Sequence, residues 1–107
     1  MKPGDIWIVH IPELGTHEQS GVRPAVVVAS VAKTIVTIIP CTSNKAALRF
    51  PFTLPLTPTQ KNGLVSTSIA LVFHIRAIDT NLLKKKVGEL SRKDFALVKK
   101  EARRLIG

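Results

Sequence analysis

Acidic residues are scarce in this chain. Asp and Glu number 7 among 107 residues, against 16 Lys and Arg, which gives a formal net charge of +9 at pH 7. No acidic side chain occurs between positions 19 and 78. Sites for Mg²⁺ or Ca²⁺ need several oxygen ligands, carboxylates among them, so the sequence argues against such a site. The excess of positive charge favours an anionic partner, such as nucleic acid, an acidic protein or an anionic membrane surface.

Cysteine and long apolar runs are also nearly absent. The single cysteine, Cys41, excludes an internal disulfide, a Cys-x-x-Cys pair and a Cys/His zinc box, so no metal or cofactor is expected. The longest stretch without a charged side chain is 62–75, with 14 residues, whereas a membrane-spanning helix needs about 20 apolar residues. The apolar run that ends at Val9 is too short for a secretory signal. We therefore expect a cytoplasmic protein that does not span a membrane.

The remaining composition is that of one folded domain over residues 1–107, because 45% of the residues are hydrophobic. Runs rich in Val, Ile and Phe predict strands over 4–9, 24–29, 34–39, 50–56 and 68–78, with a short pairing segment over 87–90. Within 68–78, the two-residue period places His74 and Arg76 on one face. The long polar segment 11–22 is typical of a functional loop.

The C-terminal segment predicts a helix that begins near Ser91 and continues to about Ile106. Ser91 and Asp94 resemble a capping box. An apolar stripe at helical spacing follows, formed by Phe95, Val98, Ala102 and Leu105. The predicted fold class is therefore mainly β with a C-terminal helix (α+β), in a small barrel or sheet of antiparallel strands.

Short motifs along nearly the whole chain, in a fixed order and at similar spacing, are typical of one family. They are Pro3-Gly4-Asp5-Ile6-Trp7, His17-Glu18-Gln19, Gly21-Val22-Arg23-Pro24, Pro40-Cys41-Thr42-Ser43, Gly63-Leu64, Ile75-Arg76-Ala77-Ile78-Asp79 and Gly88-Glu89-Leu90-Ser91. On these motifs the chain resembles the MazF/PemK type of toxin endoribonuclease from bacterial toxin–antitoxin pairs.

The resemblance implies an SH3-like β barrel of the MazF/PemK/CcdB kind, usually a homodimer. It implies a growth inhibitor that cuts single-stranded RNA (mRNA) at a short sequence without a metal, leaving 2′,3′-cyclic phosphate and 5′-hydroxyl ends. The implied partner is an antitoxin whose acidic, disordered tail lies along the RNA groove, which fits the basic composition.

Carried over by motif, the resemblance makes Arg23 and Thr42 catalytic residues. The planar guanidinium of Arg23 suits a phosphate, and the hydroxyl of Thr42 can donate to a phosphate oxygen. Glu18 is the predicted third catalytic residue. The predicted RNA-binding residues are His17, Gln19, Ser43, His74 and Arg76.

The sequence leaves open which residue is the general base, because neither Arg nor Thr accepts a proton at neutral pH. Glu18, His17 and His74 are the candidates, and some relatives carry an acidic residue at the position of Phe73. Two alternative functions also remain: a non-enzymatic toxin of the same fold that binds DNA gyrase, and a catalytically weak RNA-binding module.

Aromatic side chains divide into two expected groups. Trp7, Phe73 and Phe95 lie in apolar segments, and we expect them to pack in the core. Phe50 and Phe52 follow Arg49 in a segment bounded by proline, so they are the candidates for stacking on nucleic-acid bases.

Overall fold

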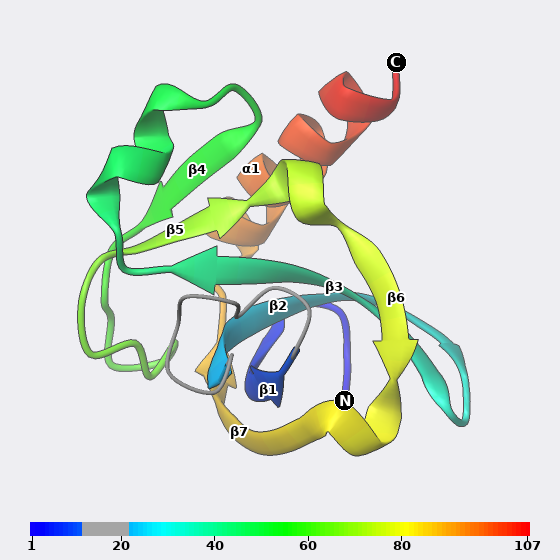
Figure 1. Cartoon of the computed structure of the whole chain (residues 1–107). Coiled ribbons are helices and arrows are strands. Elements are labelled where there is room, and N and C mark those ends of the chain that lie inside the picture. The colour runs from blue at the N-terminus through cyan, green and yellow to red at the C-terminus, as the bar shows by residue number, and fades with distance from the viewer. Residues whose placement is uncertain (12–21) are drawn as a thin grey trace.

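The computed structural model describes residues 1–11 and 22–107 (Figure 1). Within these ranges the chain forms seven strands, three short 3₁₀ helices and one α-helix. In chain order they are β1 (Asp5–His10), β2 (Val22–Ala32), β3 (Ile35–Thr42), η2 (Lys45–Arg49), β4 (Thr53–Leu56), β5 (Ser68–Leu71), η3 (Val72–His74), β6 (Arg76–Asp79), η4 (Thr80–Leu82), β7 (Leu83–Glu89) and α1 (Arg92–Ile106).

All the strand pairs in the described part of the chain are antiparallel. The hydrogen-bonded order is β4-β5-β3-β2-β1-β7, and β6 pairs with β3 beside this path. The predicted class, antiparallel strands with a C-terminal helix, is confirmed. Across residues 1–11 and 22–107 the path ends at β4 and at β7, so the sheet is open rather than a barrel closed by hydrogen bonds.

Both faces of the central strands are buried, against two separate apolar clusters. Val26 and Ile39 belong to the first cluster, and Val27 and Ile38 belong to the second. Successive side chains of a strand point to opposite faces, so a strand buried on both faces carries Val and Ile without interruption. This explains the dense Val and Ile runs of β2 and β3.

The helix α1 covers the first cluster. Ser91 caps it, because its Oγ accepts the backbone N–H of Asp94 at 3.1 Å. The predicted apolar stripe is confirmed, with Val98 and Ala102 buried and Phe95 and Leu105 packed beside them. No helix among the described residues is long and apolar enough to cross a membrane.

The strand predicted over 68–78 is wrong, because η3 interrupts it. β5 pairs with Cys41 and Thr42, whereas β6 pairs with Ile35 to Ile38 along the same edge of β3. The two registers differ by three residues, which is the length of η3. The turn therefore takes up the three extra residues, and the two-residue period does not hold across it.

Smaller differences concern the neighbouring segments. η2 was not predicted, and β4 is shorter than the strand expected over 50–56. Phe52, just before β4, has a φ of +58°, in the left-handed region that few residues other than glycine adopt. β7 extends over Leu83–Glu89 rather than 87–90 and pairs with β1.

A turn at Asn62 and Gly63 fixes the segment that leads into β5. The buried Asn62 side chain accepts the backbone N–H groups of Thr59 and Leu64 through Oδ1, each at 3.0 Å. Its Nδ2 donates to the carbonyl of Thr57 at 2.9 Å. Gly63 has a φ of +70°, which glycine adopts without steric cost.

The same turn lies directly against Gly88 of β7. A Cβ at Gly88 would overlap the backbone carbonyls of Asn62 and Lys61. The N–H of Glu89 donates to the carbonyl of Lys61 at 2.9 Å. Only glycine allows this approach of turn to strand.

Candidate functional site

The antiparallel pairing of β2 with β3 brings the start of β2 beside the end of β3. Ala25 pairs with Pro40, and Arg23 and Thr42 each lie two residues beyond this pair, at the same end of the two strands. Both residues line the same two cavities. The sheet itself therefore brings together two residues that are 19 positions apart in the sequence.

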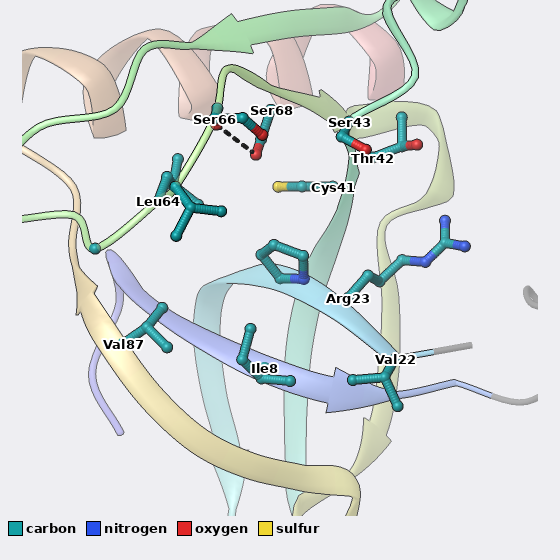
Figure 2. Close-up of a pocket in the computed structure, with 13 residues that line it drawn as sticks. Ile8, Val22, Arg23, Cys41, Thr42, Ser43, Leu64, Ser66, Ser68 and Val87 are labelled. Atoms are coloured by element: carbon teal, nitrogen blue, oxygen red, sulfur yellow. Dashed lines mark hydrogen bonds between the residues drawn. The ribbon is translucent and has the colours of Figure 1, made fainter. Parts of the chain in front are cut away.

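One cavity on this edge, about 440 Å³ in volume, is called here the hydroxyl pocket. Figure 2 shows Arg23 extending from β2 on one side of it, with Leu64 and Val87 on the other. Ser68 Oγ donates to the carbonyl of Ser66 at 3.2 Å. The lining residues are Ile8, Val22, Arg23, Pro24, Cys41, Thr42, Ser43, Gly63, Leu64, Val65, Ser66, Ser68 and Val87.

A second, smaller cavity of about 240 Å³ shares Arg23 and Thr42 with the first and is called the aromatic recess. It is formed by the end of β3, η2, the end of β5 and η3. Its lining residues are Arg23, Thr42, Asn44, Ala46, Ala47, Arg49, Phe50, Leu71, Phe73 and His74. None of the described residues that line either cavity is acidic, so the shared edge is suited to an anion.

The Thr42 hydroxyl has a defined orientation. Its Oγ1 accepts the backbone N–H of Asn44 at 3.2 Å, in the local turn that follows β3. A hydroxyl has one proton to donate besides its acceptor lone pairs. Thr42 can therefore donate that proton to an oxygen placed in either cavity.

His74 carries the one histidine side chain that lines the described part of this site. Partial burial lowers the pKa of its imidazole below 6.5, and the positive charges of Arg76 and then Arg23 lower it further. The ring is therefore neutral at physiological pH, with one nitrogen able to accept a proton. The effect of both arginines on this pKa also shows that Arg23 and Arg76 lie close enough to His74 to act on its charge.

Cys41 lines the hydroxyl pocket but is poorly suited to react. Its side chain is 1% exposed, and burial raises the pKa of its thiol to about 12. Because the thiolate is the nucleophile, this cysteine is chemically inert at neutral pH. Among the described residues, no group of three or more His, Cys, Asp or Glu side chains could hold a metal ion.

The structure brings several of the predicted site residues together. Arg23, Thr42 and Ser43 line the hydroxyl pocket, and His74 joins Arg23 and Thr42 in the aromatic recess. Arg76 lies outside both linings, and its charge acts on His74. The predicted residues His17, Glu18 and Gln19 lie outside the described residues.

Two expectations about aromatic residues are wrong. Phe73 belongs to neither buried cluster and lines the aromatic recess, because the turn η3 turns it away from the core. Phe52 packs against the first cluster, with the guanidinium of Arg104 5.4 Å from its ring centre, and it does not line either cavity. Phe50, the other predicted stacking candidate, lines the recess.

Comparison with known proteins gives the family. Residues 2–106 match the family described as PemK-like, MazF-like toxin of type II toxin–antitoxin system. Endoribonuclease MazF9 of Mycobacterium tuberculosis (strain ATCC 25618 / H37Rv) is 31% identical over 105 residues, which cover 90% of this chain and 87% of the relative. The chain therefore belongs to the PemK-like, MazF-like toxins.

Solved structures agree on the fold. MazF (Form-I) from Deinococcus radiodurans superposes with a TM-score of 0.73 at 25% identity, covering 99% of this chain and 94% of that one. The Mycobacterium tuberculosis toxin MazF-mt6 has a TM-score of 0.74 at 17% identity, with 95% of each chain covered. An endoribonuclease in complex with its cognate antitoxin, from a mycobacterial species, has a TM-score of 0.71 at 14% identity, covering 100% of this chain and 93% of that one.

Proposed function

We propose that this toxin is a sequence-specific, metal-independent endoribonuclease that cleaves single-stranded RNA at the edge shared by the two cavities. The observation that carries the proposal is the position of Arg23 and Thr42, because both residues line both cavities. None of the described residues that line these cavities is acidic, so the phosphate of RNA meets no negative side chain among them. Membership of the family and the relative named Endoribonuclease MazF9 support the activity.

In the proposed reaction the nucleophile is the 2′-hydroxyl of the RNA. Its oxygen attacks the adjacent phosphorus, and the bond from phosphorus to the 5′-oxygen breaks. The products are a 2′,3′-cyclic phosphate and a 5′-hydroxyl end. Arg23 stabilises the negative charge that develops on the phosphorane, and Thr42 donates a hydrogen bond to a non-bridging oxygen.

The 2′-hydroxyl must lose its proton to a base. Among the described residues, His74 is suited to accept it, because the lowered pKa keeps its imidazole neutral at physiological pH. Glu18 and His17 remain predicted candidates for the same step. The departing 5′-oxygen is stabilised by the charge of Arg23 until water protonates it.

The same basic surface supports two proposed partners. We propose that an antitoxin with an acidic, disordered tail covers the RNA site, because the chain carries a net charge of +9 and a structural relative is solved in complex with its cognate antitoxin. A homodimer is proposed from the family resemblance. A cytoplasmic location is proposed for a toxin that acts on mRNA.

The test is incubation of purified protein with a long single-stranded RNA in the presence of EDTA, followed by mapping of the new ends. We expect discrete cuts that leave 2′,3′-cyclic phosphate and 5′-hydroxyl ends. Arg23→Ala should lower the cleavage rate by about 100-fold or more. Thr42→Ala should do the same, whereas Thr42→Ser, which keeps the hydroxyl, should retain most activity.

Arg103→Ala is the matched control, because Arg103 is exposed on α1 and lines neither cavity. It removes the same charge and should cleave like the wild type. Cleavage by folded Arg23→Ala at the wild-type rate would overturn the assignment of the site. Intact RNA with the folded wild-type protein would overturn the ribonuclease itself and favour a toxin that acts by binding.

A further inference from the structure

The aromatic recess contains a cluster of ring side chains beside the proposed cleavage point. Phe50 and Phe73 meet edge to face, with ring centres 6.0 Å apart and planes inclined by 65°. The ring of His74 lies 4.6 Å from that of Phe73, at an angle of 46°. The guanidinium of Arg49 is 4.9 Å from the centre of the Phe50 ring.

Core packing does not explain this cluster. Phe50 is 46% exposed and Phe73 is half-buried, and neither belongs to a buried apolar cluster. The helix η2, which leads into Phe50, buries none of its residues. Two large aromatic side chains thus remain accessible in a concave surface, which is typical of a binding site rather than of a folding requirement.

The neighbours of the cluster determine what kind of ligand fits. Arg23 and Thr42, which we assign to the scissile phosphate, form one wall of the recess, and Arg49 adds a second guanidinium. A ligand here therefore meets aromatic faces and positive charge at once. Single-stranded nucleic acid offers the complementary pair, a flat base beside an anionic phosphate.

We propose that the aromatic recess binds the RNA base adjacent to the scissile phosphate, by stacking on Phe50 and Phe73. This inference rests on the proposed function. The exposed side chain of Arg49 stacks on the base or contacts the next phosphate as the base enters. The recess thereby contributes to the choice of cleavage sequence, because bases differ in how strongly they stack.

The first test measures binding separately from cleavage. The probe is an RNA oligonucleotide of the mapped cut sequence, 2′-O-methylated so that no nucleophile is available. Phe50→Ala should weaken its binding about 10-fold, since stacking of one base on an aromatic side chain accounts for a factor of this order. Phe50→Leu, which keeps an apolar side chain without a ring, should show most of the same loss.

Leu48→Ala is the matched control, because Leu48 lies on η2, is 45% exposed and does not line the recess. It should bind the probe like the wild type. Phe50→Trp should keep the affinity, and its added tryptophan fluorescence should be quenched when the probe binds. Wild-type affinity in Phe50→Ala and Phe50→Leu would overturn the inference.

The second test removes the base instead of the ring. An oligonucleotide with an abasic site next to the scissile phosphate should bind the wild type about 10-fold more weakly, and Phe50→Ala should no longer distinguish it from the complete oligonucleotide. Equal losses in both proteins would show that the base and Phe50 do not interact. A Phe50→Ala variant that keeps its RNA affinity but loses binding of an acidic antitoxin peptide would also overturn the inference.

Failure of this inference is distinct from failure of the proposed function. Suppose that the wild type cuts RNA and that Arg23→Ala and Thr42→Ala lose this activity, but that neither Phe50→Ala nor the abasic site weakens binding of the probe. Then only the base-binding role of the recess is wrong. If the wild type neither cuts RNA nor binds the methylated probe, then both proposals are wrong.

Discussion

The hydroxyl pocket and the aromatic recess share Arg23 and Thr42, yet they are built in different ways. The walls of the hydroxyl pocket come largely from β1, β2, β3 and β7 and from the turn that Asn62 fixes. The recess is formed mainly by η2, which buries no residue, and by the three-residue turn η3. One side of the proposed catalytic edge is thus part of the folded core, and the other is a surface segment.

This difference separates stability from specificity. A substitution in the walls of the hydroxyl pocket disturbs strands on which folding depends. The residues of these walls are therefore constrained both by folding and by the proposed activity. A substitution on η2 changes the lining of the recess at little cost to folding, because surface substitutions away from buried contacts change stability by about 0.5 kcal/mol or less. Under the proposed roles, the sequence preference can therefore change on the recess side while the edge that carries Arg23 and Thr42 stays fixed.

The largest expected effect breaks the hydroxyl-pocket side. Gly88→Ala places a Cβ against the carbonyls of Lys61 and Asn62, and the turn must move away from β7. We expect a loss of about 3 kcal/mol in the free energy of unfolding, measured by urea denaturation. Lys85→Ala, on the exposed face of the same strand, is the control and should unfold at the wild-type urea concentration. A Gly88→Ala protein as stable as the wild type would contradict the conclusion that the turn cannot move away from β7 without loss of stability.

A second experiment sharpens the role of His74 at the shared edge. If neutral His74 accepts the proton, the cleavage rate rises as the pH increases through a pKa below 6.5 and is level above it, because the protonated ring cannot act as a base. His74→Gln should lower the cleavage rate on the plateau by about 100-fold and abolish the rising limb of the pH profile.

Arg76→Gln provides the informative companion variant. Removing this positive charge should shift the limb to higher pH, since Arg76 holds the pKa of His74 down. The level rate should change far less than in His74→Gln. An unchanged pH profile in His74→Gln would exclude His74 as the base and leave Glu18 and His17 as the candidates.

The smallest effect concerns the recess side. Asn44 caps η2, because its Oδ1 accepts the N–H of Ala46 at 3.0 Å. Asn44→Ala should cost about 1 kcal/mol of local stability, seen as faster hydrogen exchange at the amides of η2. The urea midpoint should hardly move, because η2 lies outside the buried clusters. Asn44→Asp keeps the hydrogen-bond acceptor and should retain slow hydrogen exchange. A large shift of the urea midpoint in Asn44→Ala would instead show that η2 and the core unfold as one unit.

The hydrophobic periodicity of the sequence predicted the strands and the helix well where the apolar pattern of a segment matches the faces that the fold buries. The Val and Ile runs of β2 and β3 and the stripe of α1 are such cases. It failed at η3, because the need for a turn there arises from the three-residue difference between the registers of β5 and β6 on β3. No local preference of Val72 or Phe73 encodes that difference.

The same reason limits prediction of the site. Arg23 and Thr42 could be assigned from the family motifs, and their proximity follows once β2 and β3 are paired. The placement of Phe73 could not be predicted, because a continuous strand would have buried it. Phe50 was predicted, together with Phe52, as a candidate for stacking on bases, but its contact with Phe73 depends on the turn.

The open sheet also affects how this toxin behaves in a concentrated solution. An unpaired outer strand is a template on which another chain can add a strand, and proteins discourage this with lysine or proline at the edge. Here β7 carries Lys84, Lys85 and Lys86, and β4, at the other end, has only four residues and contains Pro55. Both ends of the sheet are thus protected against the addition of a strand from another copy of the chain, and so against self-templated aggregation at high protein concentration.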